Sequence, residues 1–284
     1  MSPQPIGALP VDAATLMVLR DNKQRGEVEV FCVKRNSKSR FLPGAVVFPG
    51  GRVDPSDRDP IWSRLTHVSA RLEPALSPFR IAACRETFEE AALLPAVIPA
   101  LPQARIEQMR AQTVTNTSFF FRLLLQEERQ LDLTKLPFLA RWITPLQEPI
   151  RFDTFFFGAI ARPGQTGLHD EHETTASFWT SPRELLNRSG SGELLLAPPT
   201  YCMLELVATL PSAEHLFSFA RNDSNEPIVP HIVPFNDTRL LLLPGDPEHN
   251  VRTGLGHRTT RFLWKNDRWL PHSVTSLDDM HESH

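Results

Sequence analysis

The sequence predicts an α/β protein in which helices sandwich a mixed β-sheet and an irregular β extension follows. Three features of the chain support this fold class. Apolar runs of strand length precede a segment with helical periodicity. An aromatic run of strand length comes after that segment, and beyond Pro211 the chain becomes rich in Pro, Asn and Asp.

The clearest predicted helix covers about residues 78–94. Ser77-Pro78 is a typical start, with Ser as N-cap and Pro in the first turn, and Pro95 cannot continue a helix. Further helical segments are expected over residues 102–125, from Ser181 onward and over 199–209. Strands are expected at about residues 14–19, 28–34, 45–48, 152–160, 176–179, 239–243 and 260–264.

Three carboxylates leave one face of the helix at 78–94. Glu86, Glu89 and Glu90 stand at positions i, i+3 and i+4, and Arg85 lies four residues before Glu89, within reach of its carboxylate. The opposite face carries an apolar stripe, made by Ile81, Cys84, Phe88, Ala91 and Ala92. The helix is therefore expected to present an all-oxygen cluster that suits Mg²⁺ or Mn²⁺.

A glycine pair closes the apolar run 45–48. Phe48-Pro49-Gly50-Gly51 predicts a strand that stops at a backbone able to approach a phosphate or a metal ion closely. An isolated acidic helical face is usually solvated surface. The glycine pair upstream is what favours a binding site here.

Taken together, these two segments resemble the box of the Nudix hydrolases. That box runs Gly, five residues, Glu, seven residues, then Arg-Glu-aliphatic-any-Glu-Glu-any-Gly-aliphatic. The matching positions are Gly51, Arg85, Glu86, Glu89, Glu90 and Leu93. The resemblance implies a Nudix-type α/β/α sandwich in which Glu86, Glu89, Glu90 and Gly51 hold the metal, and Arg85, Glu86 and Glu89 serve catalysis.

The chain departs from the box in three respects. Arg85 follows Gly51 by 34 positions, so roughly 20 extra residues, about 55–74, form an insert of a length that is usually functional or packed as a flap. Asp57 stands where the family has its first Glu, and the auxiliary acid is left open among Asp54, Asp57 and Glu73. Ala92 replaces the Gly of the box, a mild change if the helix continues through it, and Thr87 replaces the aliphatic residue.

A basic segment before the glycine pair resembles an element of the coenzyme A diphosphatases in the Nudix family. Arg35, Arg40, Gly44 and Phe48 have its spacing, and Asn36 departs from it. Lys34 and Lys38 add cations that could grip a 3′-phosphate and a diphosphate. The residues expected to bind substrate are Lys34, Arg35, Arg40, Gly44, Phe48, Gly50 and Gly51. The insert, with residues 151–157 and 198–200, resembles the peroxisomal-type branch of these diphosphatases.

An acidic cluster at residues 169–173 has two interpretations. Such a string is usually a solvated loop, but its place before a short strand resembles the region where many Nudix enzymes keep an extra Glu. Glu173 is the expected catalytic residue there, with Glu171 as the second choice. A zinc site from His169 and His172 is not expected, because no fourth ligand lies nearby.

Composition narrows the function further. The net charge of −3 over 284 residues offers no basic field for nucleic acid. Cys32, Cys84 and Cys202 lie far apart on apolar stretches, which indicates reduced, buried thiols and a cytoplasmic setting. No signal segment or run of membrane-spanning length is found, so no membrane association is expected.

The sequence therefore predicts metal-dependent hydrolysis of a nucleotide diphosphate, with coenzyme A or acyl-coenzyme A split into 3′,5′-ADP and a phosphopantetheine. Two alternatives stay open: a Nudix enzyme for ADP-ribose or a dinucleotide, and a non-catalytic nucleotide-binding module. A Nudix domain is expected over residues 11–210, a C-terminal extension over 211–271 and a disordered tail over 272–284. A homodimer is left open.

Overall fold

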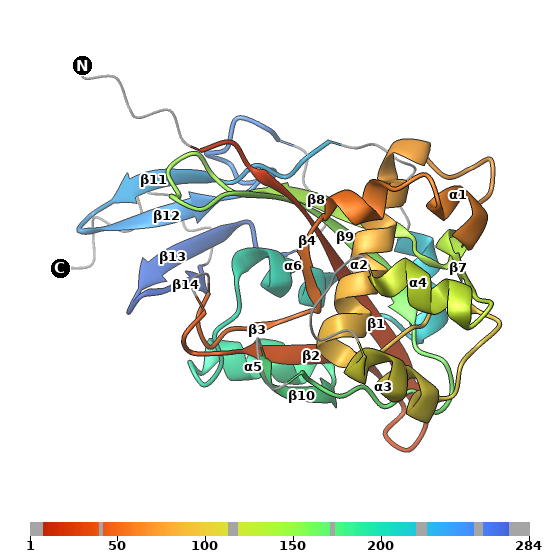
Figure 1. Ribbon diagram of the computed structural model, residues 1–284. Coiled ribbons are helices and arrows are strands. Elements are labelled where there is room, and N and C mark those ends of the chain that lie inside the picture. The colour runs from red at the N-terminus through yellow and green to blue at the C-terminus, as the bar shows by residue number, and fades with distance from the viewer. Residues whose placement is uncertain are drawn as a thin grey trace.

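The central strand β1 (Val11–Asn22) is the axis of the main sheet (Figure 1). In the computed structural model the described residues are 8–39, 42–112, 119–170, 174–219, 226–252 and 258–272. Within them, β1 pairs in parallel with β9 (Phe152–Ile160) and antiparallel with β2 (Glu27–Arg35) and β4 (Gly50–Arg52). The described part of this mixed sheet has the order β10-β2-β1-β9-β8, and β3 and β4 add to β2 and β1.

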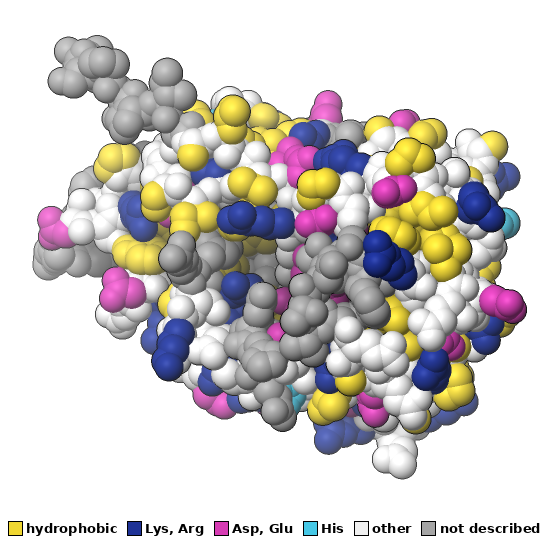
Figure 2. Space-filling model, viewed as in Figure 1, with side chains coloured by type: hydrophobic (Ala, Val, Ile, Leu, Met, Phe, Trp, Pro, Cys, Tyr) yellow, Lys and Arg dark blue, Asp and Glu magenta, His cyan; other side chains and the backbone are white. Residues whose placement is uncertain are grey.

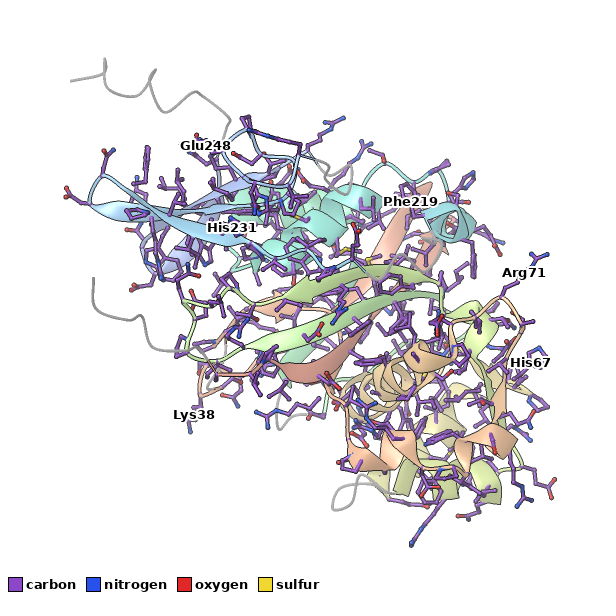
Figure 3. All side chains as sticks on the ribbon, turned by 90° about the horizontal axis from the view of Figure 1, so that it is seen from above. Lys38, His67, Arg71, Phe219, His231 and Glu248 are labelled. Carbon is purple, nitrogen blue, oxygen red and sulfur yellow. The ribbon has the colours of Figure 1, made fainter. Side chains whose placement is uncertain are left out.

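Alternation along β1 separates two hydrophobic clusters. Ala14, Leu16 and Val18 belong to the cluster under helix α2, whereas Met17 and Leu19 belong to the cluster on the opposite face. That opposite face is covered by α5 (Pro182–Gly190), α6 (Pro198–Val207) and a second sheet. Seen from above, the strands that carry His231 form a layer beside the main sheet, away from α2 (Figure 3). The expected sandwich with a mixed sheet is confirmed.

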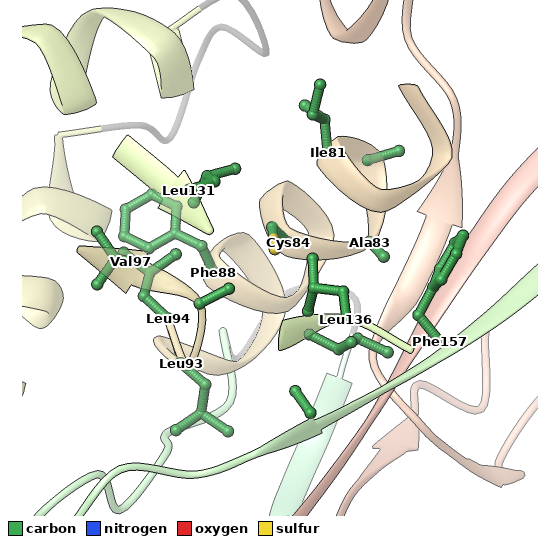
Figure 4. Packing of buried hydrophobic residues seen from close by; sticks show 14 of the residues in the cluster. Ile81, Ala83, Cys84, Phe88, Leu93, Leu94, Val97, Leu131, Leu136 and Phe157 are labelled. Carbon is green, nitrogen blue, oxygen red and sulfur yellow. The ribbon is translucent and has the colours of Figure 1, made fainter. Parts of the chain in front are cut away.

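Helix α2 (Ser77–Ala91) carries the acidic face. Its stripe is confirmed, because Ile81, Cys84 and Phe88 are all buried in the first cluster, as the close view in Figure 4 shows. The expected end at residue 94 is wrong. Ala92 adopts the left-handed conformation, with φ 49° and ψ 40°, and closes the helix there. Burial of Ala92 and the two leucines after it offsets the cost of this backbone.

The insert between the glycine pair and α2 is built into the core. It holds η1 (Pro55–Arg58), α1 (Trp62–Leu65), β5 (Thr66–His67) and η2 (Pro74–Leu76). Strand β5 joins a small sheet with β7 (Gln130–Asp132) and β6 (Val97–Ile98). Trp62 packs on Phe120 with ring centroids 5.8 Å apart.

The segment predicted as one helical stretch over 102–125 contains two described helices, α3 (Gln103–Ala111) and α4 (Phe119–Gln126). Residues 113–118 between them lie outside the described residues. The remaining strands of the main sheet are β3 (Val46–Val47), β8 (Phe138–Ile143) and β10 (Thr174–Thr180). A short 3-10 turn, η3 (Leu133–Lys135), leads into β8.

Beyond α6, a 3-10 segment η4 (Ala213–Phe219) leads to an antiparallel sheet of β11 (His231–Phe235), β12 (Thr238–Leu242), β13 (Arg261–Lys265) and β14 (Arg268–Pro271). The strands expected near 239–243 and 260–264 are confirmed as β12 and β13. In the buried interior, Arg261 Nη2 lies 2.7 Å from Asp246 Oδ1. We call β11–β14 the C-terminal sheet. Residues 273–284, most of the expected tail, lie outside the described residues.

Two further expectations concern the whole chain. Cys32, Cys84 and Cys202 are all buried and unpaired, as predicted. Among the described helices, none combines the length and the apolar character needed to cross a bilayer.

Candidate active site

Close contacts explain both glycines of the corner, with backbone and Thr15 atoms at Gly50 and the Glu86 side chain at Gly51. A β-carbon on Gly50 would lie 2.5 Å from the carbonyl oxygen of Ala14, and one on Gly51 would lie 2.5 Å from the Cδ of Glu86. No larger residue fits either position without movement of its neighbours. Strand β4 therefore lies directly against the acidic side of α2, as the resemblance to the box implied.

Arg85 joins this corner to the insert and to the acids. Its Nε and Nη2 donate to the two oxygens of Asp57, each at 2.9 Å, and Nη2 also donates to the carbonyl of Arg52 at 2.9 Å. Its Nη1 donates to Glu86 at 2.9 Å and to Glu89 at 3.0 Å. Of the three candidate auxiliary acids, Asp57 is thus the one that pairs with Arg85. Its side chain and that of Arg85 are 1% and 2% exposed.

Exposure separates the three glutamates of α2. Between Phe79 and Val97 every residue is buried except Glu86 and Glu89. Glu90 is 4% exposed, and one of its oxygens accepts the Gly50 N–H at 3.1 Å. The structure therefore brings Glu86 and Glu89 together at the surface, and directs Glu90 inward to the backbone of the glycine corner.

The charges at this corner oppose one another. Burial raises the pKa of Glu89 to about 7, Arg85 acts in the opposite direction, and the neighbouring Glu86 raises the pKa again. Burial also opposes the charge on Arg85, but Asp57, Glu86 and Glu89 hold the pKa of its guanidinium above the usual value. A further positive charge between the two surface acids would relieve the repulsion between them.

Within the described residues, no three His, Cys, Asp or Glu side chains are close enough to form a ready metal site. The donors at the corner nevertheless suit a hard divalent cation, because they are carboxylate oxygens of α2. The backbone of Gly51 lies next to them, and a β-carbon at Gly51 would overlap the Glu86 carboxylate. The donor chemistry of the corner thus fits the expected cation.

The residues expected to bind substrate are placed unevenly. Lys34 is exposed and Arg35 half-buried at the end of β2, and Gly44 has φ +71°, a conformation that favours glycine. Phe48 is 3% exposed within the second cluster, so its side chain is part of the core in this structure. Arg40 lies outside the described residues.

The acidic cluster is described only in part. Glu171, His172 and Glu173 lie outside the described residues, so the expected role of Glu173 stays a prediction. Asp170 accepts hydrogen bonds from the backbone and the hydroxyl of Thr174, at 2.9 and 2.8 Å. The backbone N–H of His169 donates to Ser177. These contacts tie the start of the cluster to strand β10.

Two features of the corner were not identified from the sequence. The carbonyl of Arg52 accepts from Arg85, and no side-chain pattern reports a carbonyl contact. Thr15 lies beside Gly50, with its Oγ1 2.6 Å from the position of a β-carbon on that glycine. Only strand pairing places it there, because Thr15 is opposite Gly50 in the register of β1 and β4.

Comparison with known proteins gives a consistent result. The family model described as the NUDT19 Nudix domain matches residues 70–207. An acyl-coenzyme A diphosphatase NUDT19 of Gallus gallus is 30% identical over 285 residues, covering 80% of this chain and 75% of that protein. The protein of the same description from Xenopus laevis is 26% identical, covering 80% of this chain and 74% of its own length.

A solved structure agrees with these relatives. The crystal structure of a NUDIX hydrolase from Alicyclobacillus acidocaldarius superposes with a TM-score of 0.63 at 32% identity, covering 74% of this chain and 96% of that chain. The likeness thus extends from the box to most of the fold, and this chain belongs to the Nudix hydrolase family, among the NUDT19-type diphosphatases.

Proposed function

We propose that this protein hydrolyses the diphosphate bond of coenzyme A or acyl-coenzyme A, giving 3′,5′-ADP and the corresponding phosphopantetheine. The observation that carries the proposal is the selective exposure along α2, where Glu86 and Glu89 alone are not buried between Phe79 and Val97. Both carboxylates are held by Arg85 next to the Gly50–Gly51 corner. The substrate class is supported by the printed activity of the NUDT19 relatives.

The proposed metal ligands are Glu86, Glu89, Glu90 and the backbone of Gly51. When bound there, Mg²⁺ or Mn²⁺ neutralises charge on the diphosphate oxygens and lowers the pKa of a water molecule. Arg85 fixes the positions of Glu86 and Glu89, since one nitrogen bonds to both carboxylates. Gly51 leaves space for the anhydride beside Glu86, because any side chain there would overlap the carboxylate.

The cations at the end of β2 form the proposed grip on the phosphates. Lys34 is exposed and Arg35 half-exposed on the strand that leads to the glycine corner. With Arg40 and Gly44, these residues would hold the 3′-phosphate and the diphosphate. Glu173 remains the proposed extra acid for activating water or binding metal.

A substrate panel tests the proposal. The purified protein is incubated with Mg²⁺ and, separately, with coenzyme A, acetyl-coenzyme A, ADP-ribose and a dinucleotide, and products are identified by mass spectrometry. We expect 3′,5′-ADP from the two coenzyme A substrates. Cleavage of ADP-ribose with none of coenzyme A would replace this proposal by the second Nudix activity, and no cleavage at all would favour a binding module.

Metal removal tests the cation separately. We expect dialysis against EDTA to abolish hydrolysis and added Mg²⁺ or Mn²⁺ to restore it, and comparison of the two restored rates identifies the better ion. Activity that survives EDTA would contradict the metal assignment.

For the cellular setting we propose the cytoplasm, on the strength of three buried, unpaired thiols. A homodimer and the division at residues 211 and 272 stay predictions.

A further inference from the structure

Thr15 is unusually open for its position. It lies in the middle of the central strand β1, between Gly50 of β4 and Phe156 of β9. The two residues that follow it, Leu16 and Met17, are 0% exposed, yet Thr15 is only partly buried. Alternation along β1 places Thr15 on the face of Met17 and Leu19, away from α2, so this face is partly exposed beside Gly50 of the glycine corner.

The C-terminal sheet packs on this same face of the main sheet and is attached to the rest of the protein at two places. Arg239 Nη1 lies 3.7 Å from Glu148 Oε1 in the loop between β8 and β9. Arg268 donates to the carbonyl of Gly192 at 2.8 Å, in the loop between α5 and α6. That second loop continues to Leu195, whose carbonyl accepts the N–H of Val46 at 2.9 Å. The C-terminal sheet is thus connected, through this loop, to strand β3, which precedes Gly50.

Arg239 and two aromatic rings lie in a row on one face of the C-terminal sheet. Strand register places Trp264 opposite Trp269, and both share a face with Leu241 and Phe262, which pack in the second cluster. The two indoles meet edge to face with centroids 5.0 Å apart. The guanidinium of Arg239 lies 4.6 Å from the Trp264 ring and 5.2 Å from the Trp269 ring. All three side chains are partly exposed.

A cross-strand Trp pair can stabilise a hairpin without any ligand. Two observations favour a binding role in addition. Trp142, only 3% exposed and part of the same cluster, has an indole Nε1 without a hydrogen-bond partner among the described residues. Hydrophobic side chains and Lys or Arg side chains also lie close together over the C-terminal strands and the adjoining edge of the main sheet (Figure 2).

The chemistry of the row identifies the kind of ligand. Indole faces and a guanidinium plane both stack on nucleobases. We propose that Arg239, Trp264 and Trp269 form a subsite for the purine end of the nucleotide substrate, while its diphosphate lies at the Gly50–Gly51 corner. This inference rests on the proposed function for the identity of the nucleotide.

Binding of the separated products tests the subsite without turnover. Adenosine 3′,5′-bisphosphate and 4′-phosphopantetheine are each titrated by calorimetry, in EDTA, into the intact protein and into Trp264→Leu, Trp269→Leu and Arg239→Leu. We expect the dissociation constant of the bisphosphate to rise about tenfold in each variant, as for loss of one stacking contact. That of phosphopantetheine should stay unchanged. With coenzyme A and Mg²⁺, KM should rise and kcat should stay within about twofold.

Trp179→Leu is the matched control. Trp179 is also a partly exposed indole under an arginine, with the guanidinium of Arg20 4.1 Å from its ring, but it lies on the edge strand β10. We expect unchanged bisphosphate binding in this variant. Equal binding in the control and in folded Trp264 and Trp269 variants would overturn the subsite, as would a parent protein that does not bind the bisphosphate.

Two outcomes separate this inference from the proposed function. Weakened bisphosphate binding in the variants of a protein that does not cleave coenzyme A would support the subsite and refute the proposed activity. Cleavage of coenzyme A with equal KM in parent and variants would support the proposed activity and refute the subsite. If circular dichroism shows that the Trp variants do not fold, Arg239→Leu decides, because it leaves both rings in place.

Discussion

Arg85 is the residue on which the geometry of the corner depends. Five hydrogen bonds fix its guanidinium to Asp57, Arg52, Glu86 and Glu89. Three of these partners are charged, and the fourth is a carbonyl of the strand that holds Gly51. Substitution of the buried partner Asp57 should therefore affect both stability and the position of the acids.

Asp57→Asn is expected to lower the free energy of unfolding by about 3 kcal/mol, because it leaves a buried arginine without its main counter-charge. Both side chains of this pair are almost fully buried. Urea unfolding followed by circular dichroism measures the change. Asp12→Asn is the control, since the Arg58–Asp12 pair is 47% and 46% exposed and should contribute less than about 1 kcal/mol. Equal losses of unfolding free energy in the two variants would contradict the role given to the Arg85–Asp57 pair.

Glu89→Gln should lower kcat by about 100-fold or more, on the scale of losing one principal electrostatic group. The side chain is 25% exposed and the amide keeps an acceptor for Arg85, so the melting temperature should change little. Turnover of coenzyme A with Mg²⁺ provides the measurement. Glu127→Gln removes another carboxylate paired with an arginine, Arg105, and should leave kcat unchanged. Parental turnover in Glu89→Gln would refute the assignment.

At the scale of elements, the turn between β13 and β14 depends on backbone conformation. Asn266 and Asp267 both have positive φ, at 52° and 56°, as in the tight turns preferred by Asn-Gly. Asp267→Gly should therefore keep or raise stability, whereas Asp267→Val should lower it by about 1–2 kcal/mol. Thermal melts of the two variants measure the difference. Equal melting temperatures would mean that the turn does not constrain the hairpin.

The sequence predicted the elements that have strong local signals. The stripe of Ile81, Cys84 and Phe88 was identified correctly because helical periodicity is a local property. The end of α2 was placed too late, since nothing local reveals that the buried leucines after Ala92 stabilise a left-handed residue. Strands β11 and β14 were not predicted, because their pairing partners and not their composition define them.

In the candidate site, too, the features with a local signal were predicted and those set by long-range contacts were not. The positions of Arg85, Glu86 and Glu89 follow from helix geometry once the box is identified. The partner of Arg85 was left open among three acids, since the insert changes the spacing and only its folding brings Asp57 to the guanidinium. The positions of Thr15 and of the C-terminal sheet depend on contacts between residues far apart in the chain, which a single sequence does not report.

At the scale of the whole molecule, the partly buried His231 of β11 links stability to pH. Burial lowers the pKa of His231, and His249, stacked 4.2 Å away, lowers it further. The folded state therefore disfavours the protonated ring. This contribution to stability is full above the pKa of the unfolded chain, about 6.5, and is lost as pH falls through the lower folded value.

The urea midpoint should consequently be lower at about pH 5.5 than at about pH 7.5, and His231→Phe should show a smaller decrease than the parent. The phenyl ring keeps the stacking surface on His249 but cannot be protonated. Unfolding curves of both proteins at the two pH values provide the measurement. An identical decrease in the two proteins would show that other groups carry the acid sensitivity.

The burial pattern of α2 determines how easily a mutation can produce an inactive but folded relative. Of the residues from Phe79 to Val97, Glu86 and Glu89 alone contribute little to the core. A single codon change at either position could silence the chemistry and leave a well-folded protein that still recognises nucleotides. Inactive paralogues are therefore only one mutation away, and their folding would give no sign of the loss.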